Sequence, residues 1–275
     1  MESIPFSYIY NHILALPLTV NGESHRFIFD TGIGLTVISK SLAERYGLAT
    51  KESFSGKRMS GQEISIPLTT LDSIGVGSFS RKKVTVGIFD LSSPIPELRG
   101  IGGILSPGFL EDVVFQVNND SKEIILLNGR EDKDGKEAVP VPVHIVKEGP
   151  SLSIFVDAFL PTGRRVRLEV DSGSDVLILN SPLMEELNVP KDGEETKEFR
   201  GTDETGHNYV RYLSRLNGKI SIFGREELSE QDPEVVFQDI IYDGLIGTSF
   251  LRRYNVTYDL SNSEMLFTKR VTKIF

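Results

Sequence analysis

Short apolar segments separated by turn residues recur along the chain, a pattern typical of β proteins. Residues 13–20 are rich in apolar side chains, Asn-Gly at 21–22 is a strong hairpin signal, and residues 26–29 lead into Asp30. This pattern predicts two strands around a tight turn, with an aspartate directly after the second strand.

The same design returns in the second half of the chain. Residues 154–160 precede a Pro-Thr-Gly turn, and the alternating residues 165–168 lead into Asp171. After the two aspartates, apolar segments at 35–38 and 176–179 predict a further strand in each half.

A short helix is predicted after each of these strands. In the first half Ser39 is suited to cap the helix and Gly47 to close it. In the second half the helix is expected over 181–187, where Pro182 suits the first helical turn.

Segments containing glycine then precede further strand patterns in both halves. The first contains Ser60, Gly61 and Gln62, and the second runs from Gly206 to Tyr209. Both predict a hairpin with glycine near its tip. Such a hairpin can serve as a flap that closes over a bound peptide, although an ordinary surface hairpin explains either segment equally well when taken alone.

The two halves are related by a constant offset, which indicates an internal duplication. Phe29-Asp30-Thr31-Gly32 corresponds to Val170-Asp171-Ser172-Gly173, 141 residues later. The same offset carries Ile104-Leu105 onto Leu245-Ile246, Phe109-Leu110 onto Phe250-Leu251, and Glu123-Ile124-Ile125 onto Glu264-Met265-Leu266.

We expect an all-β protein of about 16 short strands arranged in two lobes. The first lobe is expected over residues 1–130 and the second over 138–275. Residues 131–137 are charged and poor in apolar side chains, which is typical of a linker.

Composition narrows the possible functions. The 275 residues include 39 acidic and 30 basic side chains, a net charge of −9, and no cysteine. The acidic balance makes nucleic acid an unexpected partner, and the absence of cysteine excludes disulfides and thiolate chemistry. No apolar stretch approaches the length of a membrane span. The protein is expected in the cytoplasm if Met1 is the native start, and outside it if a leader has been removed.

The doubled Asp-hydroxyl-Gly pattern points to a specific chemistry. A single copy is more often an ordinary turn, but a two-fold arrangement of the halves brings Asp30 and Asp171 together. Two facing carboxyls disfavour each other's ionisation, so the pair presents a base and an acid beside one water molecule. Aspartic proteases are the established example of this arrangement. No cofactor and no metal ion are expected.

The two triplets, each followed later by an apolar pair and a Phe-Leu, resemble the aspartic proteases of the pepsin and retropepsin type. The resemblance covers almost the whole chain and implies a bilobal pepsin-like fold built from two retropepsin-like halves. It implies an endopeptidase with Asp30 and Asp171 as the catalytic pair. The residues expected to support the pair and lock the two loops together are Thr31, Gly32, Ser172, Gly173 and Ser174.

The first half departs from the family pattern. Ile33-Gly34 follows Gly32 where the family has small polar residues, and Ser106 stands where the second half has Gly247. We therefore expect the first aspartate loop to be packed differently from the second. The family's flap tyrosine has no match near Gly61, whereas Tyr209 lies in the corresponding region of the second half.

Two other interpretations remain open. In one, the fold is a catalytically silent module that binds a peptide or protein, and in the other, two chains each complete the other's site. Retention of both aspartates, both hydroxyls and both glycines favours the enzyme, and one chain with both aspartates favours a monomer. The expected partner is a peptide or an unfolded protein.

Overall fold

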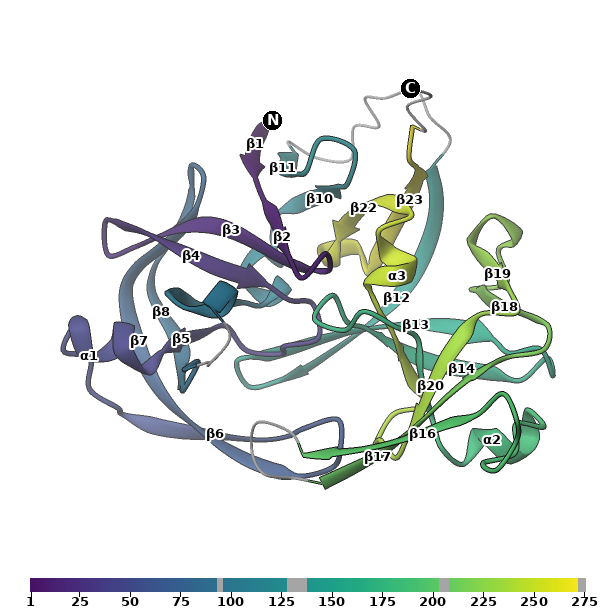
Figure 1. Ribbon diagram of the computed structural model, residues 1–275. Coiled ribbons are helices and arrows are strands. Elements are labelled where there is room, and N and C mark those ends of the chain that lie inside the picture. Colours follow the sequence, from purple (N-terminus) through teal and green to yellow (C-terminus); the bar gives the residue numbers. More distant parts are fainter. Residues whose placement is uncertain (93–95, 128–137, 203–207, 272–275) are drawn as a thin grey trace.

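The computed structural model describes residues 1–92, 96–127, 138–202 and 208–271. Within these residues it contains 23 strands and only short helices (Figure 1), so the predicted all-β class is confirmed. Several of the strands have only three or four residues, a length at which apolar patterns reveal few strands, although the strands expected near 35–38 and 176–179 do form.

The first half of the chain contains eleven strands. Its elements are β1 (Glu2–Pro5), β2 (Ser7–Ile9), β3 (Ile13–Val20), β4 (Glu23–Phe29), β5 (Val37–Ser39), α1 (Lys40–Arg45), β6 (Glu52–Lys57), β7 (Glu63–Val76), β8 (Phe79–Phe89), the 3-10 helix η1 (Pro96–Leu98), β9 (Ile101–Leu105), the 3-10 helix η2 (Pro107–Leu110), β10 (Val114–Asn118) and β11 (Glu123–Leu127).

The second half contains the other twelve strands. Its elements are β12 (Ala138–Glu148), β13 (Ser151–Phe159), β14 (Arg165–Val170), β15 (Ile178–Asn180), α2 (Leu183–Glu186), β16 (Lys197–Thr202), β17 (Asn208–Arg215), β18 (Lys219–Ile222), the 3-10 helix η3 (Glu226–Leu228), β19 (Ser229–Gln231), β20 (Glu234–Gln238), β21 (Gly244–Ile246), α3 (Thr248–Leu251), β22 (Tyr254–Asp259), the 3-10 helix η4 (Leu260–Asn262) and β23 (Glu264–Lys269).

The strands of the two halves pair in corresponding orders. One sheet runs β2-β3-β4-β9-β5-β8-β7-β6, and part of the larger sheet runs β12-β13-β14-β21-β15-β20-β17-β16. In both, the strand before the aspartate (β4 or β14) pairs in parallel with β9 or β21. In turn, β9 pairs antiparallel with β5, and β21 pairs antiparallel with β15. The two halves therefore place their aspartates at equivalent points of equivalent strand arrangements.

A shared set of strands joins the two halves at the top of Figure 1, in the order β1-β11-β10-β22-β23-β12. β10 and β22 are antiparallel, with Gln116 opposite Thr257. The Gln116 Nε2 donates a hydrogen bond to the Thr257 Oγ1 at 3.0 Å, and these residues are 141 positions apart. Phe115 stacks on Tyr258 beside them, with ring centroids 4.8 Å apart.

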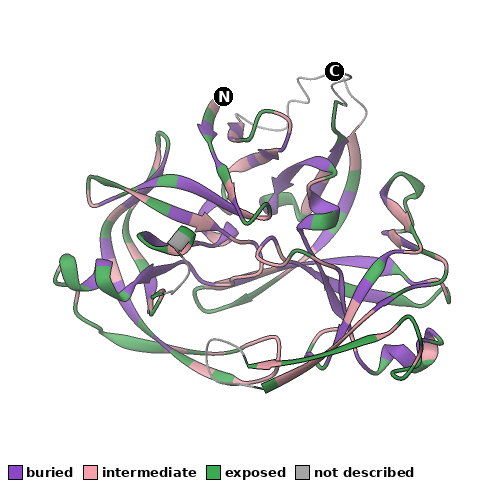
Figure 2. Cartoon of the chain, in the orientation of Figure 1, coloured by how far each residue is buried: buried purple, intermediate pink, exposed green. Residues whose placement is uncertain are grey.

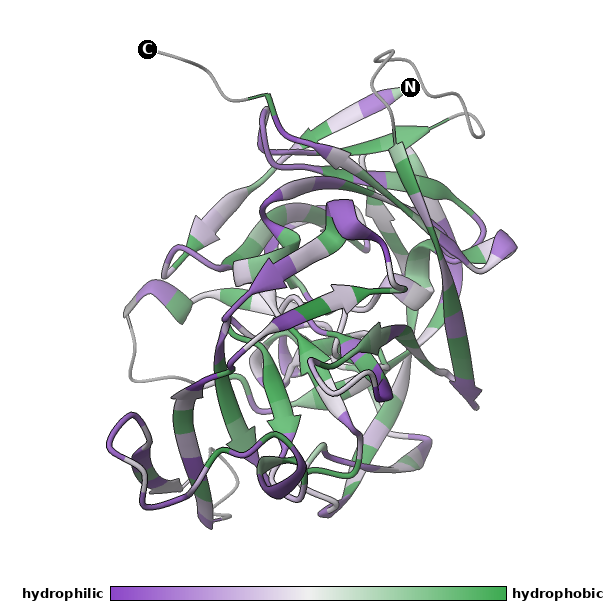
Figure 3. Cartoon of the chain, turned by 90° about the vertical axis from the view of Figure 1, so that its right-hand side faces the viewer, coloured by the Kyte–Doolittle hydropathy of each residue, from purple (hydrophilic) through white to green (hydrophobic). Residues whose placement is uncertain are grey.

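Buried apolar side chains run through both halves as one large cluster. Figures 2 and 3 show these buried, hydrophobic residues within the strands, with the polar residues on outer turns and hairpins. Phe27 and Phe29 on β4 have at most 1% of their surface exposed, as has Leu168 on β14. The strands that end at the two aspartates are therefore firmly packed.

Local signals of the sequence agree with the elements that form. Asn21 and Gly22 both have positive φ, 49° and 87°, as the tight turn between β3 and β4 requires. The Ser39 side chain caps α1 by accepting a hydrogen bond from the Leu42 N–H. α2 is shorter than expected, because Pro182 takes the N-cap position instead of entering the first turn.

The expected linker at 131–137 lies outside the described residues, as does Gly206.

Candidate active site

The two aspartates leave their strands in the same way. The Asp30 N–H donates to the Leu105 carbonyl at 3.1 Å, and the Asp171 N–H donates to the Ile246 carbonyl at 3.0 Å. Each bond extends the parallel ladder between the strand before the aspartate and its neighbour by one residue. The backbone of each loop is thus fixed to the sheet at the carboxyl-bearing residue.

Reciprocal hydrogen bonds join the two loops. The Thr31 N–H donates to the Ser172 Oγ at 3.0 Å, and the Ser172 N–H donates to the Thr31 Oγ1 at 2.9 Å. Both residues are buried, so these bonds satisfy backbone groups that water cannot reach. Each hydroxyl oxygen thus accepts a hydrogen bond from the backbone of the other loop.

The glycines allow the close approach of the carboxyls. A Cβ added to Gly32 would lie 2.3 Å from the Asp171 Oδ1, and one added to Gly173 would lie 2.4 Å from the Asp30 Oδ2. Any side chain at either position would displace the facing carboxyl. The Gly32 N–H donates to the Asp30 Oδ1 at 2.8 Å, and the Gly173 N–H donates to the Asp171 Oδ1 at 2.9 Å.

Burial governs the electrostatics of this pair. Loss of solvation raises the pKa of Asp30, and backbone N–H groups that hydrogen-bond to its carboxylate partly offset that effect. Burial also raises the pKa of Asp171 well above its usual value, with further contributions from the charges of Asp30 and Glu169. The pair therefore retains a proton at pH values where an exposed aspartate is fully ionised.

Sequence reasoning missed a third buried carboxyl, Glu169. Only 5% of its surface is exposed. Burial, with a smaller contribution from the charge of Asp30, raises the pKa of Glu169 to about 8, against a hydrogen bond with Ser153 that lowers it. Its equivalent at the 141-residue offset is Ile28. A third charged residue that continues the alternation of Arg165 and Arg167, where the other half has isoleucine, was the available signal.

The departures in the first half have structural reasons. A Cβ on Gly34 would lie 2.0 Å from the Ser151 Oγ, so the hairpin between β12 and β13 packs directly on this glycine. The Gly34 carbonyl accepts hydrogen bonds from the Leu152 N–H and the Ser106 Oγ, both at 2.9 Å. In the second half the equivalent carbonyl, that of Asp175, accepts a hydrogen bond from the Ser249 N–H at 2.7 Å instead. The two loops are thus braced by different groups.

The β6–β7 turn reaches the second half of the chain. Gly61 has φ of +82°, and a Cβ on it would lie 3.1 Å from the Ile241 Cγ2. The Ile241 N–H donates to the Met59 carbonyl at 2.8 Å. The Ser60 Oγ is buried and has no hydrogen-bond partner among the described residues. Figure 1 shows this hairpin extending across the bottom of the view toward β16 and β17.

The remaining predicted residues lie in other settings. The Gln62 carbonyl accepts from the Arg58 N–H within the β6–β7 turn. Tyr209 lies on β17 with its ring beneath the Arg211 guanidinium, 4.3 Å from the ring centroid. Ser174 belongs to the second aspartate loop, where its N–H donates to the Asp171 carbonyl at 3.3 Å. No contact places Tyr209 beside the carboxyl pair within the described part of the chain.

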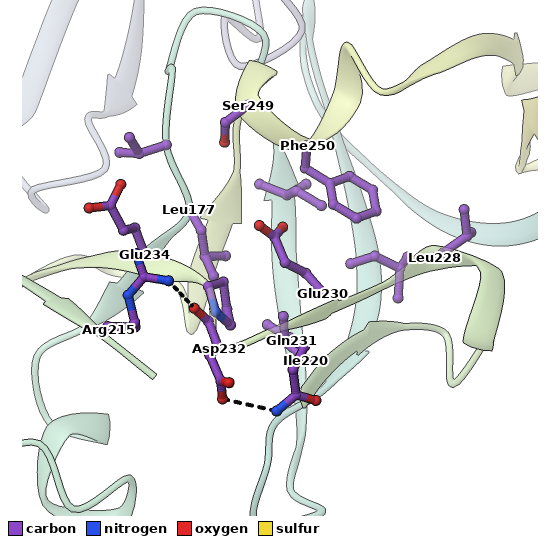
Figure 4. Close-up of a pocket in the computed structure, with 14 residues that line it drawn as sticks. Leu177, Arg215, Ile220, Leu228, Glu230, Gln231, Asp232, Glu234, Ser249 and Phe250 are labelled. Carbon is purple, nitrogen blue, oxygen red and sulfur yellow. Dashed lines mark hydrogen bonds between the residues drawn. The ribbon is translucent and has the colours of Figure 1, made fainter. Parts of the chain in front are cut away.

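A pocket of about 240 Å³ lies apart from these residues in the second half (Figure 4). Its wall is apolar, and its rim carries charged side chains from the segment between β17 and β20. Arg215, Glu230 and Asp232 belong to that rim, and Leu177 and Phe250 to the wall. None of the predicted site residues lines it.

The described ranges lack two further kinds of feature. They contain no group of three or more His, Asp or Glu side chains placed to hold a metal ion. No helix in them is long and apolar enough to cross a membrane.

Comparison with known families gives one match. Residues 16–109 match a family described as aspartyl protease, and this segment contains Asp30, Thr31 and Gly32. The match supports an aspartyl protease, and so a hydrolase that acts on peptides. A search of curated proteins found no match.

Proposed function

We propose that the protein is an aspartic endopeptidase in which Asp30 and Asp171 form the catalytic pair. The observation that supports this most directly is the reciprocal hydrogen bonding between Thr31 and Ser172, which holds the two carboxyls face to face. The family match supports the activity from the first half alone, and the geometry supplies an equivalent second carboxyl.

In the proposed mechanism the pair holds one proton and one negative charge around a water molecule. The ionised carboxylate accepts a proton from the water as the water oxygen attacks the amide carbonyl carbon. The protonated carboxyl meanwhile donates to the carbonyl oxygen, where negative charge develops. The proton taken from the water then passes from the carboxyl to the leaving amine nitrogen as the C–N bond breaks. The raised pKa values of both aspartates support a shared proton over a wide pH range.

The β6–β7 turn is the better candidate for the flap. Its contacts with Ile241 bring a first-half hairpin to the half that carries Asp171. The unpartnered Ser60 hydroxyl supports the same role, because a buried hydroxyl gains most from a ligand that completes its hydrogen bonding. A substrate backbone N–H or carbonyl supplies such a group.

We further propose that the chain is a duplicated, two-lobed monomer with a pseudo-two-fold relation between its halves. The lobes are assigned to residues 1–130 and 138–275, joined by 131–137. The matching strand orders support this, as does the pairing of Gln116 with its own repeat equivalent Thr257. A peptide or unfolded protein is the proposed substrate.

The test is detection of new peptide termini by mass spectrometry after incubation with a denatured-protein mixture from acid to neutral pH. Wild type is compared with Asp30→Asn and Asp171→Asn. Asp72→Asn serves as the matched control, because Asp72 is an exposed aspartate paired only with Lys83. Unfolding curves establish that every variant is folded.

We expect wild type and Asp72→Asn to cut, and both dyad variants to lose at least about a thousandfold in rate. Cutting that survives in both folded dyad variants would overturn the assignment of the pair. A folded wild type that leaves the mixture intact at every pH would instead support the silent binding module.

A further inference from the structure

Glu169 lies on the sheet face toward which the β6–β7 turn reaches. Its register partners are Phe155 on β13 and Leu245 on β21, so these three side chains share one face. Leu245 belongs to an apolar cluster that Met59 of the turn packs against. Glu169 therefore sits beside the proposed catalytic pair and on the side covered by the proposed flap.

An aromatic pair borders Glu169 on this face. Phe155 and Tyr242 meet edge to face, with ring centroids 5.2 Å apart. Burial raises the pKa of Tyr242 to about 12, and the charges of Glu169, Glu148 and Asp171 add to the effect. The same two rings line an open pocket of about 560 Å³, whose charged lining residues are Asp157, Asp243, Arg165 and Arg167. Solvent thus reaches the aromatic wall next to the buried carboxyl.

Glu169 has no cationic partner within the described ranges. Arg167, two residues earlier on the same strand, lies 3.9 Å from Asp157. Asp157 also receives the side chains of Arg165 and His144. The two arginines on this face thus lie against Asp157, and the groups that act on Glu169 itself are the negative aspartates and a serine hydroxyl.

We propose that Glu169 is a specificity-determining residue that receives a lysine or arginine side chain of the substrate, next to the scissile bond. This inference rests on the proposed peptidase function. The methylene stem of the basic side chain lies against Phe155 and Tyr242, and its charged end meets the carboxylate. The cation supplies the partner that the buried carboxyl lacks in the free protein.

A change of protonation accompanies this recognition. Glu169 is mostly protonated at neutral pH, because its pKa is raised to about 8. An incoming cation favours the ionised form, so the carboxyl releases a proton when the basic side chain binds. Glu148, Asp30, Asp171 and Tyr242 also face this region, but none of them gains a paired cation in the proposal.

The test compares peptides that differ only at one residue beside the cleaved bond, with lysine against norleucine and arginine against citrulline. We expect wild type to favour the charged member by about tenfold or more in kcat/KM, and the preference to grow as pH rises toward 8. Glu169→Gln, which keeps the shape but cannot ionise, removes the preference and its pH dependence while cutting the neutral peptide. Glu148→Gln is the control for loss of an exposed negative charge nearby.

A second measurement does not depend on cleavage. In Asp30→Asn protein, calorimetry in two buffers of different ionisation enthalpy reports proton release on binding the lysine peptide, but not the norleucine peptide. The release disappears in the Asp30→Asn, Glu169→Gln double variant.

The outcomes separate the two proposals. Equal preference in wild type and Glu169→Gln, or binding without proton release, overturns the role of Glu169 while leaving the peptidase intact. If wild type cleaves no peptide but the lysine peptide still binds selectively and with proton release, the peptidase function is overturned and the recognition of a basic side chain stands.

Discussion

At the scale of single residues, burial sets the chemistry of the carboxyl groups. Asp30, Asp171 and Glu169 all titrate above their ordinary range because the protein withholds water from them. For the two aspartates the result is a shared proton, which the proposed reaction uses. For Glu169 the result is a carboxyl that stays neutral until a cation arrives.

The raised pKa of Glu169 makes a prediction about stability. The Glu169 carboxyl has a pKa of 4.5 in the unfolded chain and of about 8 in the folded protein. Its contribution to stability is therefore fully present below pH 4.5 and is lost as pH rises through about 8. Relative to Glu169→Gln, wild type should therefore lose on the order of 3 kcal/mol of unfolding free energy between these limits. Urea unfolding of both proteins at several pH values measures the difference. Parallel pH profiles would contradict the burial of an ionisable group here.

At the scale of elements, two hairpins complete the site from outside the aspartate loops. The β6–β7 turn comes from the first half and contacts Ile241 of the second. The hairpin between β12 and β13 comes from the second half and packs on Gly34 of the first. Each half thus receives a hairpin from the other half, and in the first half that hairpin packs on the aspartate loop itself.

Replacing Ser60 is expected to lower activity without lowering stability. Its hydroxyl is buried without a partner, so Ser60→Ala should leave the unfolding free energy unchanged or raise it by up to about 1 kcal/mol. The same change should lower kcat/KM about tenfold, because a hydrogen bond to the substrate is lost. Steady-state kinetics and thermal unfolding of one preparation supply both values. Unaltered kinetics would remove the turn from substrate binding, and Ser60→Thr, which keeps a hydroxyl, is the control.

The contact between Gly34 and Ser151 gives a second prediction at this scale. Gly34→Ala places a methyl group 2.0 Å from the Ser151 Oγ, and such overpacking costs about 1–3 kcal/mol. Removing the hydroxyl in Ser151→Ala should reduce that cost, so the double variant should be more stable than the sum of the two single changes implies. Unfolding free energies of the four proteins complete the cycle. Additive values would show that the hairpin does not press on this loop.

At the scale of the whole molecule, the similar patterns of the two halves made the fold class predictable from the sequence. The strand before Asp30 and the similar strand before Asp171 carry strong apolar and turn signals, and the two aspartates are 141 residues apart. Those local signals predicted β3, β4, β13, β14 and the two short helices close to where they form. The all-β class followed from them.

What the sequence concealed depends on contacts between distant segments. Nothing local shows that Ser151 packs on Gly34, or that the β6–β7 turn meets Ile241. Ser106 reads as a departure from the repeat until its hydroxyl is seen donating to the Gly34 carbonyl. Glu169 was hidden for a different reason, because it continues the alternation of Arg165 and Arg167, and that pattern gives no sign that the third polar position is buried. The candidate carboxyl pair could be predicted, but its surroundings could not.

The joining of the halves within one chain leads to a prediction about assembly. The Thr31–Ser172 bonds and the pairing of β10 with β22 connect the two halves of the same molecule. A mixture of Asp30→Asn and Asp171→Asn proteins should therefore show no more cleavage than either alone, because both aspartates of a site come from the same chain. Peptide cleavage across a range of protein concentrations is the measurement, with gel filtration of wild type at the same concentrations as the control. Activity that returns on mixing and rises with concentration would mean that two chains exchange halves, and the catalytic pair would then belong to a dimer.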